Sequence, residues 1–174
     1  LQLLKLSRPD INDDLVKATR SIDMVIEDIR HYILNLKVAN YEQQTLRSCL
    51  KDVLVRLHIP EGLHVQLNAP ERQPPFAPPV VEAVCQIAYE AVSNIVRHAN
   101  ATEAIIDVSE DAKQFQMVVR DNGKGFKANT KSERGGLGLQ NIAQRARIYG
   151  GDVKIESMPD AGTRLTLLLP IGKV

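Results

Sequence analysis

Glu90, Asn94 and His98 are the first residues whose types and spacing could do chemistry. They recur every four residues in segment 80–100, so in a helix they would share one face. Carboxylate and amide oxygens are donors that Mg2+ prefers, and this cation also binds phosphate and water. Taken alone, the stripe would equally suit a polar helix face in solvent.

The segment Asp-Asn-Gly-Lys-Gly-Phe at 121–126 is the second candidate. Gly123 and Gly125 permit positive φ and let the backbone approach a ligand closely. Asp121 ends a predicted strand, where its carboxylate could accept hydrogen bonds from an exocyclic amine or an amide. Alone, Asp-Asn-Gly is also typical of a simple turn.

The glycine-rich segment Gly-Gly-Leu-Gly-Leu at 135–139 is the third candidate, and it opens a predicted helix. Glycines before a helix N-terminus can form a cradle for an anion. The Lys-Ser or Lys-Thr of a P-loop is absent, and no βαβ unit surrounds the segment as a dinucleotide fingerprint requires. Flexible loop glycines are the alternative interpretation.

Apolar periodicity and turn residues predict the elements that position these groups. Helices are expected over 45–59, 80–100 and 137–151. Strands are expected over 63–67, 103–109, 114–121, 152–157 and 163–170. The Pro-rich stretch 68–79 should be a surface loop, since proline cannot continue a helix or strand. These elements predict an α+β sandwich, with mixed strands on one side and helices on the other.

The N-terminal part, residues 1–42, predicts a separate helical hairpin. Leu15, Ile22, Ile29 and Leu36 recur every seven residues, and a second apolar series follows three positions later. Such a stripe needs a partner, so we expect a homodimer through a four-helix bundle. Residues 43–174 would form the second domain.

The chain's composition excludes several function classes. Its 174 residues include 22 Lys+Arg and 21 Asp+Glu, a balance that argues against general nucleic-acid binding. Two cysteines suggest neither a disulfide framework nor a metal site, which favours a reducing, cytoplasmic setting. No apolar run approaches the roughly 20 residues that span a bilayer, so no membrane contact is expected within this region. The chain starts at Leu1 rather than Met, as a piece of a longer protein would, and that protein could carry a membrane anchor.

Taken together, the motifs resemble the ATP-binding domain of the GHKL superfamily, which includes gyrase, Hsp90, histidine kinases and MutL. More narrowly, the chain is similar to sensor histidine kinases of the NarX/DesK/LiaS type. The similar segments are an asparagine box at 86–102, glycine boxes at 121–126 and 135–151, and a closing strand at 162–170. The resemblance implies the Bergerat α/β sandwich, with ATP and Mg2+ as cofactors.

The resemblance also implies residue roles. Asn94 would coordinate Mg2+, and Glu90 would polarise a metal-bound water or the attacking imidazole. Asp121 would accept from the adenine amino group, with Thr163 reaching the base through Asp121 and water. Residues 127–135 would form an ATP lid. The further ATP-binding residues implied are Arg97 and His98 on the phosphate side, and Gly123, Gly125, Phe126, Gly136, Leu137, Gly138 and Leu139.

The implied activity is transfer of the γ-phosphoryl group to a histidine, then to an aspartate of a response regulator of the NarL/FixJ-like kind. The subclass carries its acceptor as His-Asp on the first dimerisation helix, and this chain has no such dipeptide. We therefore expect the acceptor before Leu1 rather than at His31. Two alternatives stay open: a protein-serine kinase of the anti-sigma-factor type, and a non-catalytic dimerisation and regulatory module.

Overall fold

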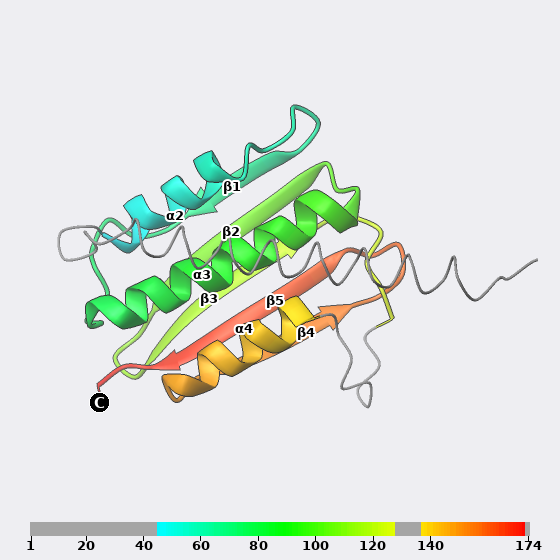
Figure 1. The fold of residues 1–174 in the computed structure, drawn as a ribbon. Coiled ribbons are helices and arrows are strands. Elements are labelled where there is room, and N and C mark those ends of the chain that lie inside the picture. Colours follow the sequence, from blue (N-terminus) through cyan, green and yellow to red (C-terminus); the bar gives the residue numbers. More distant parts are fainter. Residues whose placement is uncertain (1–44, 128–136, 173–174) are drawn as a thin grey trace, which may run out of the picture. The chain divides into compact units, whose positions relative to one another are not determined.

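A five-stranded mixed sheet forms one layer of the domain in the computed structural model, which describes residues 45–127 and 137–172 (Figure 1). These residues belong to the unit Tyr41–Val174. The hairpin expected over 1–42, Gly136 and most of the expected lid lie outside the described residues. The strands are β1 (His64–Asn68), β2 (Glu103–Glu110), β3 (Gln114–Asp121), β4 (Asp152–Ser157) and β5 (Thr163–Pro170).

The strand order is β1-β2-β3-β5-β4. The pair β1 and β2 is parallel, and the other neighbours are antiparallel. Because β5 lies between β3 and β4, Thr163 at its start pairs with Asp121 on one side and with Ser157 on the other. Three polar residues from separate strands therefore meet at one end of the sheet.

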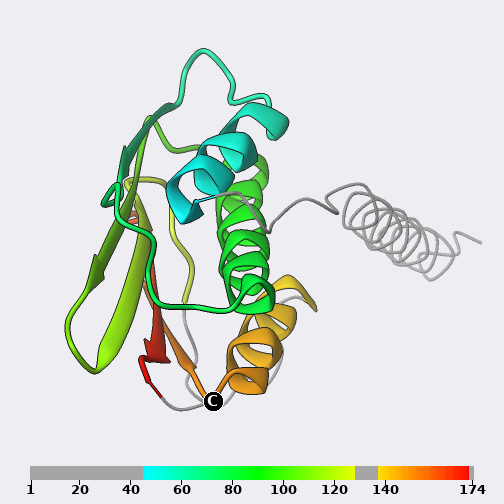
Figure 2. The ribbon, with the colours of Figure 1, turned by 90° about the vertical axis from the view of Figure 1, so that its left-hand side faces the viewer.

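The α-helices of the described residues cover one face of the sheet, as the side view shows (Figure 2). They are α2 (Leu46–Arg56), α3 (Pro78–Asn94) and α4 (Leu137–Ile148). Alternate residues of β3 and β5 point into the core beneath the helices, which confirms the predicted sandwich. No helix in the described ranges has the length and apolar character to cross a membrane. The buried strand residues are Phe115, Met117, Val119, Leu165, Leu167 and Leu169.

The long helix of the sequence analysis differs from the structure at both ends. Pro78 and Pro79, expected in a loop, form the first turn of α3. Proline is tolerated there because the first N–H groups of a helix have no partner within it. At the other end, Ile95–Ala99 forms a π-helix, and Asn100 closes it with a left-handed backbone at φ 51°.

The two cysteines, for which no disulfide framework was expected, are paired in this structure. Cys49 of α2 and Cys85 of α3 form a disulfide, and both are buried in the core. They lie 36 residues apart in the chain, and only the packing of α2 against α3 brings them together. No local spacing rule could have indicated this pair.

Helix α4 ends in a Schellman motif built on two glycines. The Gly150 N–H donates to the carbonyl of Arg147, and the Gly151 N–H donates to the carbonyl of Ala146, each at 3.0 Å. Gly150 has φ +70°, the left-handed conformation that this cap requires. A β-carbon at Gly151 would overlap the carbonyl oxygen of Leu168 in β5. Close contact at Gly151 therefore fixes the end of α4 on the sheet.

We predict that Gly151→Ala lowers the free energy of unfolding by about 1–3 kcal/mol, because the added methyl group forces helix and strand apart. Gly62→Ala is the matched control, since a β-carbon there meets nothing within 4 Å. That control should be unchanged or about 0.4–1 kcal/mol more stable. Urea denaturation of both variants checks the prediction, and equal stabilities would contradict it.

Candidate functional site

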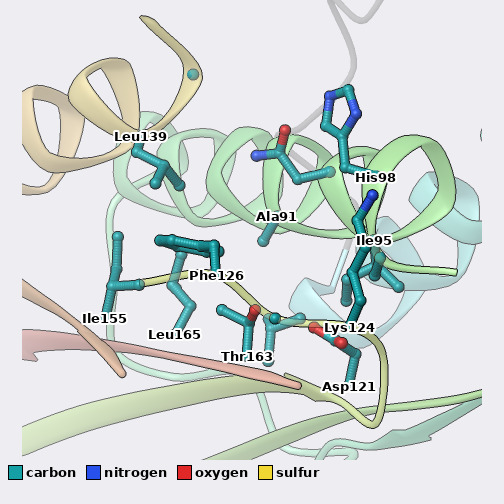
Figure 3. Close-up of a pocket in the computed structure, with 15 residues that line it drawn as sticks. Ala91, Ile95, His98, Asp121, Lys124, Phe126, Leu139, Ile155, Thr163 and Leu165 are labelled. Carbon is teal, nitrogen blue, oxygen red and sulfur yellow. The ribbon is translucent and has the colours of Figure 1, made fainter. Parts of the chain in front are cut away.

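A cavity of about 400 Å3 lies between the helices and the sheet. Helix α3 and the π-helix form one wall, α4 and the loop after β3 form another, and β3, β4 and β5 form the floor (Figure 3). Most of the lining is apolar, from Ala91, Ile95, Ala99, Val119, Phe126, Leu139, Ile155 and Leu165. The remaining lining residues are Asn94, His98, Asp121, Lys124, Gly125, Gly138 and Thr163. An apolar slot with a few polar groups suits a flat aromatic ligand with a polar edge.

Asp121 is the carboxylate at the floor of this cavity. Its Oδ1 accepts a hydrogen bond from the Gly123 N–H at 2.8 Å. Burial raises the pKa of this carboxyl group above its ordinary value of 3.8, and hydrogen bonds from the backbone N–H groups of Gly123 and Thr163 counteract part of that rise. In Figure 3, Asp121 and Thr163 lie side by side below Ile95. The cavity therefore offers a half-buried hydrogen-bond acceptor.

The loop that follows Asp121 is held by its neighbours. Oδ1 of Asn122 accepts from the backbone N–H groups of Thr102 and Glu103, each at 3.0 Å. The Lys124 N–H donates to the carbonyl of Ala99 at 2.8 Å. The end of β3 is thus tied both to the start of β2 and to the π-helix.

Glycines allow the backbones around Asp121 to touch. A β-carbon on Gly123 would overlap the carbonyl oxygen of Ala99. Gly125 has φ +55°, and a β-carbon there would overlap the carbonyl oxygen of Met158. Gly162, at φ +72°, lies as close to the carbonyl of Asp121. The glycines expected to let a ligand approach therefore also bring three protein segments together.

The polar stripe of α3 is divided by the structure. Asn94 is half-buried and lines the cavity, and His98 lies at its upper edge on the π-helix (Figure 3). Glu90 is not among the lining residues. Its carboxylate lies against Gly138 in the first turn of α4, where a β-carbon would overlap Oε1. Arg97 is exposed and does not line the cavity either.

Most of the remaining predicted residues are brought together. Gly125, Phe126, Gly138, Leu139 and Thr163 line the cavity with Asp121. Gly123 does not line the cavity, but its N–H donates to Oδ1 of Asp121. Leu137 is the first residue of α4.

Sequence reasoning missed two polar residues at the site, Lys124 and Ser157. Lys124 lines the cavity between the two glycines of the loop. Ser157 pairs with Thr163 across β4 and β5, and its hydroxyl oxygen is 3.0 Å from the Thr163 hydroxyl oxygen. A signal was present, since Ser157 ends a strand just before the turn that leads to Gly162 and Thr163, but its pairing depends on the strand order.

The residues present fit a hard cation in part. Asn94 places an amide oxygen donor at the cavity wall, and Glu90 lies one turn earlier. Mg2+ often takes only one or two protein ligands and completes its shell with phosphate and water. In the described part of the chain, no group of three or more His, Cys, Asp or Glu residues could hold a metal by itself. A cation here would therefore depend on the ligand's own oxygens.

Comparisons with known proteins agree with this geometry. The family model for histidine kinase-, DNA gyrase B- and HSP90-like ATPases matches residues 80–173. Sensor protein VraS from Staphylococcus saprophyticus is 27% identical over 177 residues, which covers 99% of this chain and 50% of that protein. Sensor protein VraS from Staphylococcus aureus is 28% identical and covers 84% of this chain and 41% of that protein. The chain spans about half the length of the curated relatives it matches.

Solved structures show the same fold. The ATP-binding domain of PrrB from Mycobacterium tuberculosis has a TM-score of 0.59 and 26% identity over 75% of this chain and 96% of that domain. The histidine kinase AdeS from Acinetobacter baumannii has a TM-score of 0.66 at 16% identity, covering 95% of this chain and 87% of that one, a likeness of fold alone. The predicted GHKL sandwich is thereby confirmed. Since the family model matches more than half of the residues, the chain belongs to the histidine kinase-, DNA gyrase B- and HSP90-like ATPase family.

Proposed function

We propose that this chain contains the catalytic and ATP-binding region of a sensor histidine kinase. The observation that carries the proposal is the half-buried carboxylate of Asp121 beside Thr163, on the floor of an otherwise apolar cavity in a chain of this ATPase family. The similar sensor proteins support a histidine kinase over a protein-serine kinase of the anti-sigma-factor type.

The apolar floor would hold adenine, with Ile155 and Leu165 against one face of the ring. Asp121 would accept a hydrogen bond from the exocyclic amine of adenine, directly and through water with Thr163. A guanine carbonyl at that position would face the carboxylate without a proton between them. Burial of unpaired acceptors is costly, so the site would select adenine.

The triphosphate would extend toward the first turn of α4 and the mouth of the cavity. The N–H groups of a helix's first turn have no partner inside the helix, and together with the positive end of the helix dipole they favour an anion there. His98 and Lys124 line the cavity, and Arg97 is exposed nearby on the π-helix. Asn94 would supply an oxygen to Mg2+, which when bound neutralises phosphate charge as the phosphoryl group leaves.

In the proposed reaction an imidazole nitrogen attacks the γ-phosphorus, the bond from phosphorus to the bridging oxygen breaks, and ADP leaves. Glu90 would assist proton transfer from the imidazole. We place the acceptor histidine outside this chain because its sequence has no His-Asp dipeptide. The phosphoryl group would then pass to a response regulator of the NarL/FixJ-like kind, from a homodimer formed through residues 1–42. Because its substrate would be ATP, this region would act in the cytoplasm.

With Mg2+ present, the chain should bind ATP and ADP, and GTP roughly 10- to 150-fold more weakly, the range expected for a hydrogen bond to a charged group. Asp121→Asn should lose most of the ATP affinity. Asp152→Asn is the control, because this exposed carboxylate lies at the opposite end of the sheet. Calorimetric titration checks these affinities, and equal binding of ATP and GTP would sink the adenine assignment.

Asp121→Asn should weaken ATP binding without lowering the stability of the ligand-free chain. The raised pKa means that the folded chain holds this proton more tightly than the unfolded chain does. The wild-type chain therefore loses stability relative to the variant as pH rises from below 3.8 through the folded-state pKa, and the difference stays constant above it. We expect the ligand-free variant to be at least as stable as wild type at pH 7. Denaturation from pH 3.5 to 7 checks this. A variant that is much less stable than wild type only at pH 7 would contradict the expected direction of the pH dependence.

The chain should bind ATP without labelling itself, and a longer protein that restores the preceding helix should form an acid-labile, base-stable phosphoramidate. In that longer protein, Asn94→Ala should abolish labelling, and Glu90→Gln should slow it by about 10²–10⁴-fold. Radiolabelled ATP gives the measurement. Labelling of the present chain would mean that an internal residue such as His31 is the acceptor.

A further inference from the structure

Ser157 lies close to the end of the cavity where Asp121 and Thr163 would bind the adenine base, but it does not line the cavity. It is the last residue of β4 and pairs with Thr163, the first residue of β5. Thr163 lines the cavity, whereas Ser157 does not. Ser157 instead lines a neighbouring hollow together with Asp121 and Thr163. Any influence of Ser157 on a ligand must therefore pass through a neighbouring residue.

The Ser157 hydroxyl has three hydrogen-bonding neighbours. It donates to the carbonyl oxygen of Gly162 at 2.9 Å, and it accepts from the Phe126 N–H at 2.9 Å. The third neighbour is the hydroxyl oxygen of Thr163, at 3.0 Å. The three contacts come from the turn, from the loop after β3 and from β5.

Proton counting settles the direction of the third contact. A serine hydroxyl has one proton and two lone pairs. A carbonyl oxygen can only accept, so the single proton of Ser157 goes to Gly162. A backbone N–H can only donate, so Phe126 uses one lone pair of Ser157. The remaining lone pair must take the proton of Thr163, whose own lone pairs stay available to the cavity.

We propose that Ser157 is a positioning residue that holds the Thr163 hydroxyl as a hydrogen-bond acceptor toward the ligand. The floor of the cavity then presents two acceptors, the Asp121 carboxylate and the Thr163 oxygen. This pair matches an exocyclic amine and its bridging water, and it repels a carbonyl at the same position. The assignment rests on the proposed adenine site and adds a second determinant of base specificity.

Removing the Ser157 hydroxyl should release the Thr163 proton. In Ser157→Ala the Thr163 hydroxyl can rotate and donate into the cavity, so it can pair with a carbonyl on the base. Inosine triphosphate is the probe, because it carries a carbonyl where adenine carries its amine. We expect the preference for ATP over inosine triphosphate to fall by about 3- to 10-fold, the range for one neutral hydrogen bond.

Three matched variants isolate the effect. Ser157→Thr keeps a hydroxyl and should keep the wild-type preference. Ser109→Ala removes an exposed hydroxyl on β2 and should do the same. The double variant Ser157→Ala with Thr163→Val has no hydroxyl to donate, so it should gain no inosine triphosphate binding over Thr163→Val alone. Titration calorimetry with both nucleotides provides the affinity ratios.

Each outcome decides a separate question. A wild-type chain without a preference for ATP over inosine triphosphate would overturn the proposed adenine site itself. If the wild type prefers ATP and Ser157→Ala prefers it equally strongly, only the role of Ser157 is overturned. The same follows if Ser157→Ala increases inosine triphosphate binding even when Thr163 is replaced by valine. If Ser157→Ala does not fold, NMR of the wild type decides, since the coupling between the Thr163 hydroxyl proton and its methyl carbon reports whether that proton points toward Ser157 or elsewhere.

Discussion

The candidate site depends on backbone atoms from three segments that lie in contact with no side chain between them. Gly123 touches the carbonyl of Ala99, Gly125 touches that of Met158, and Gly162 touches that of Asp121. Each contact excludes a β-carbon, and two of the glycines also have positive φ. The packing of the loop after β3, the π-helix and the β4–β5 turn thus determines where the Asp121 carboxylate can be.

This arrangement places a carboxylate where burial opposes its charge. Burial raises the pKa of Asp121, and hydrogen bonds from the N–H groups of Gly123 and Thr163 offset that rise only in part. A residue chosen for stability alone would be neutral here. In the proposed site, a ligand that brings a donor would replace the lost water with a hydrogen bond to this carboxylate.

Local sequence patterns predicted well those elements whose conformation the pattern itself determines. The strands over 152–157 and 163–170 match β4 and β5, since apolar alternation between turn residues specifies a half-buried strand. The pairing of Asp121, Thr163 and Ser157 could not be derived, because it requires β5 to insert between β3 and β4. The Cys49–Cys85 disulfide likewise depends on how two helices pack, and the π-helix has no local signature in the sequence.

Glu90 illustrates why a shared helix face does not guarantee a shared role. Its carboxylate lies against Gly138 in the first turn of α4. The N–H groups of a first turn have no partner inside the helix, and the helix dipole favours a negative charge there. Asn94, one turn further along α3, lies in the cavity wall instead. The stripe predicted from four-residue spacing is therefore divided between the ligand side and the helix that borders the cavity. Because the Glu90 carboxylate lies against Gly138, a shift in the start of α4 would change the surroundings of that carboxylate.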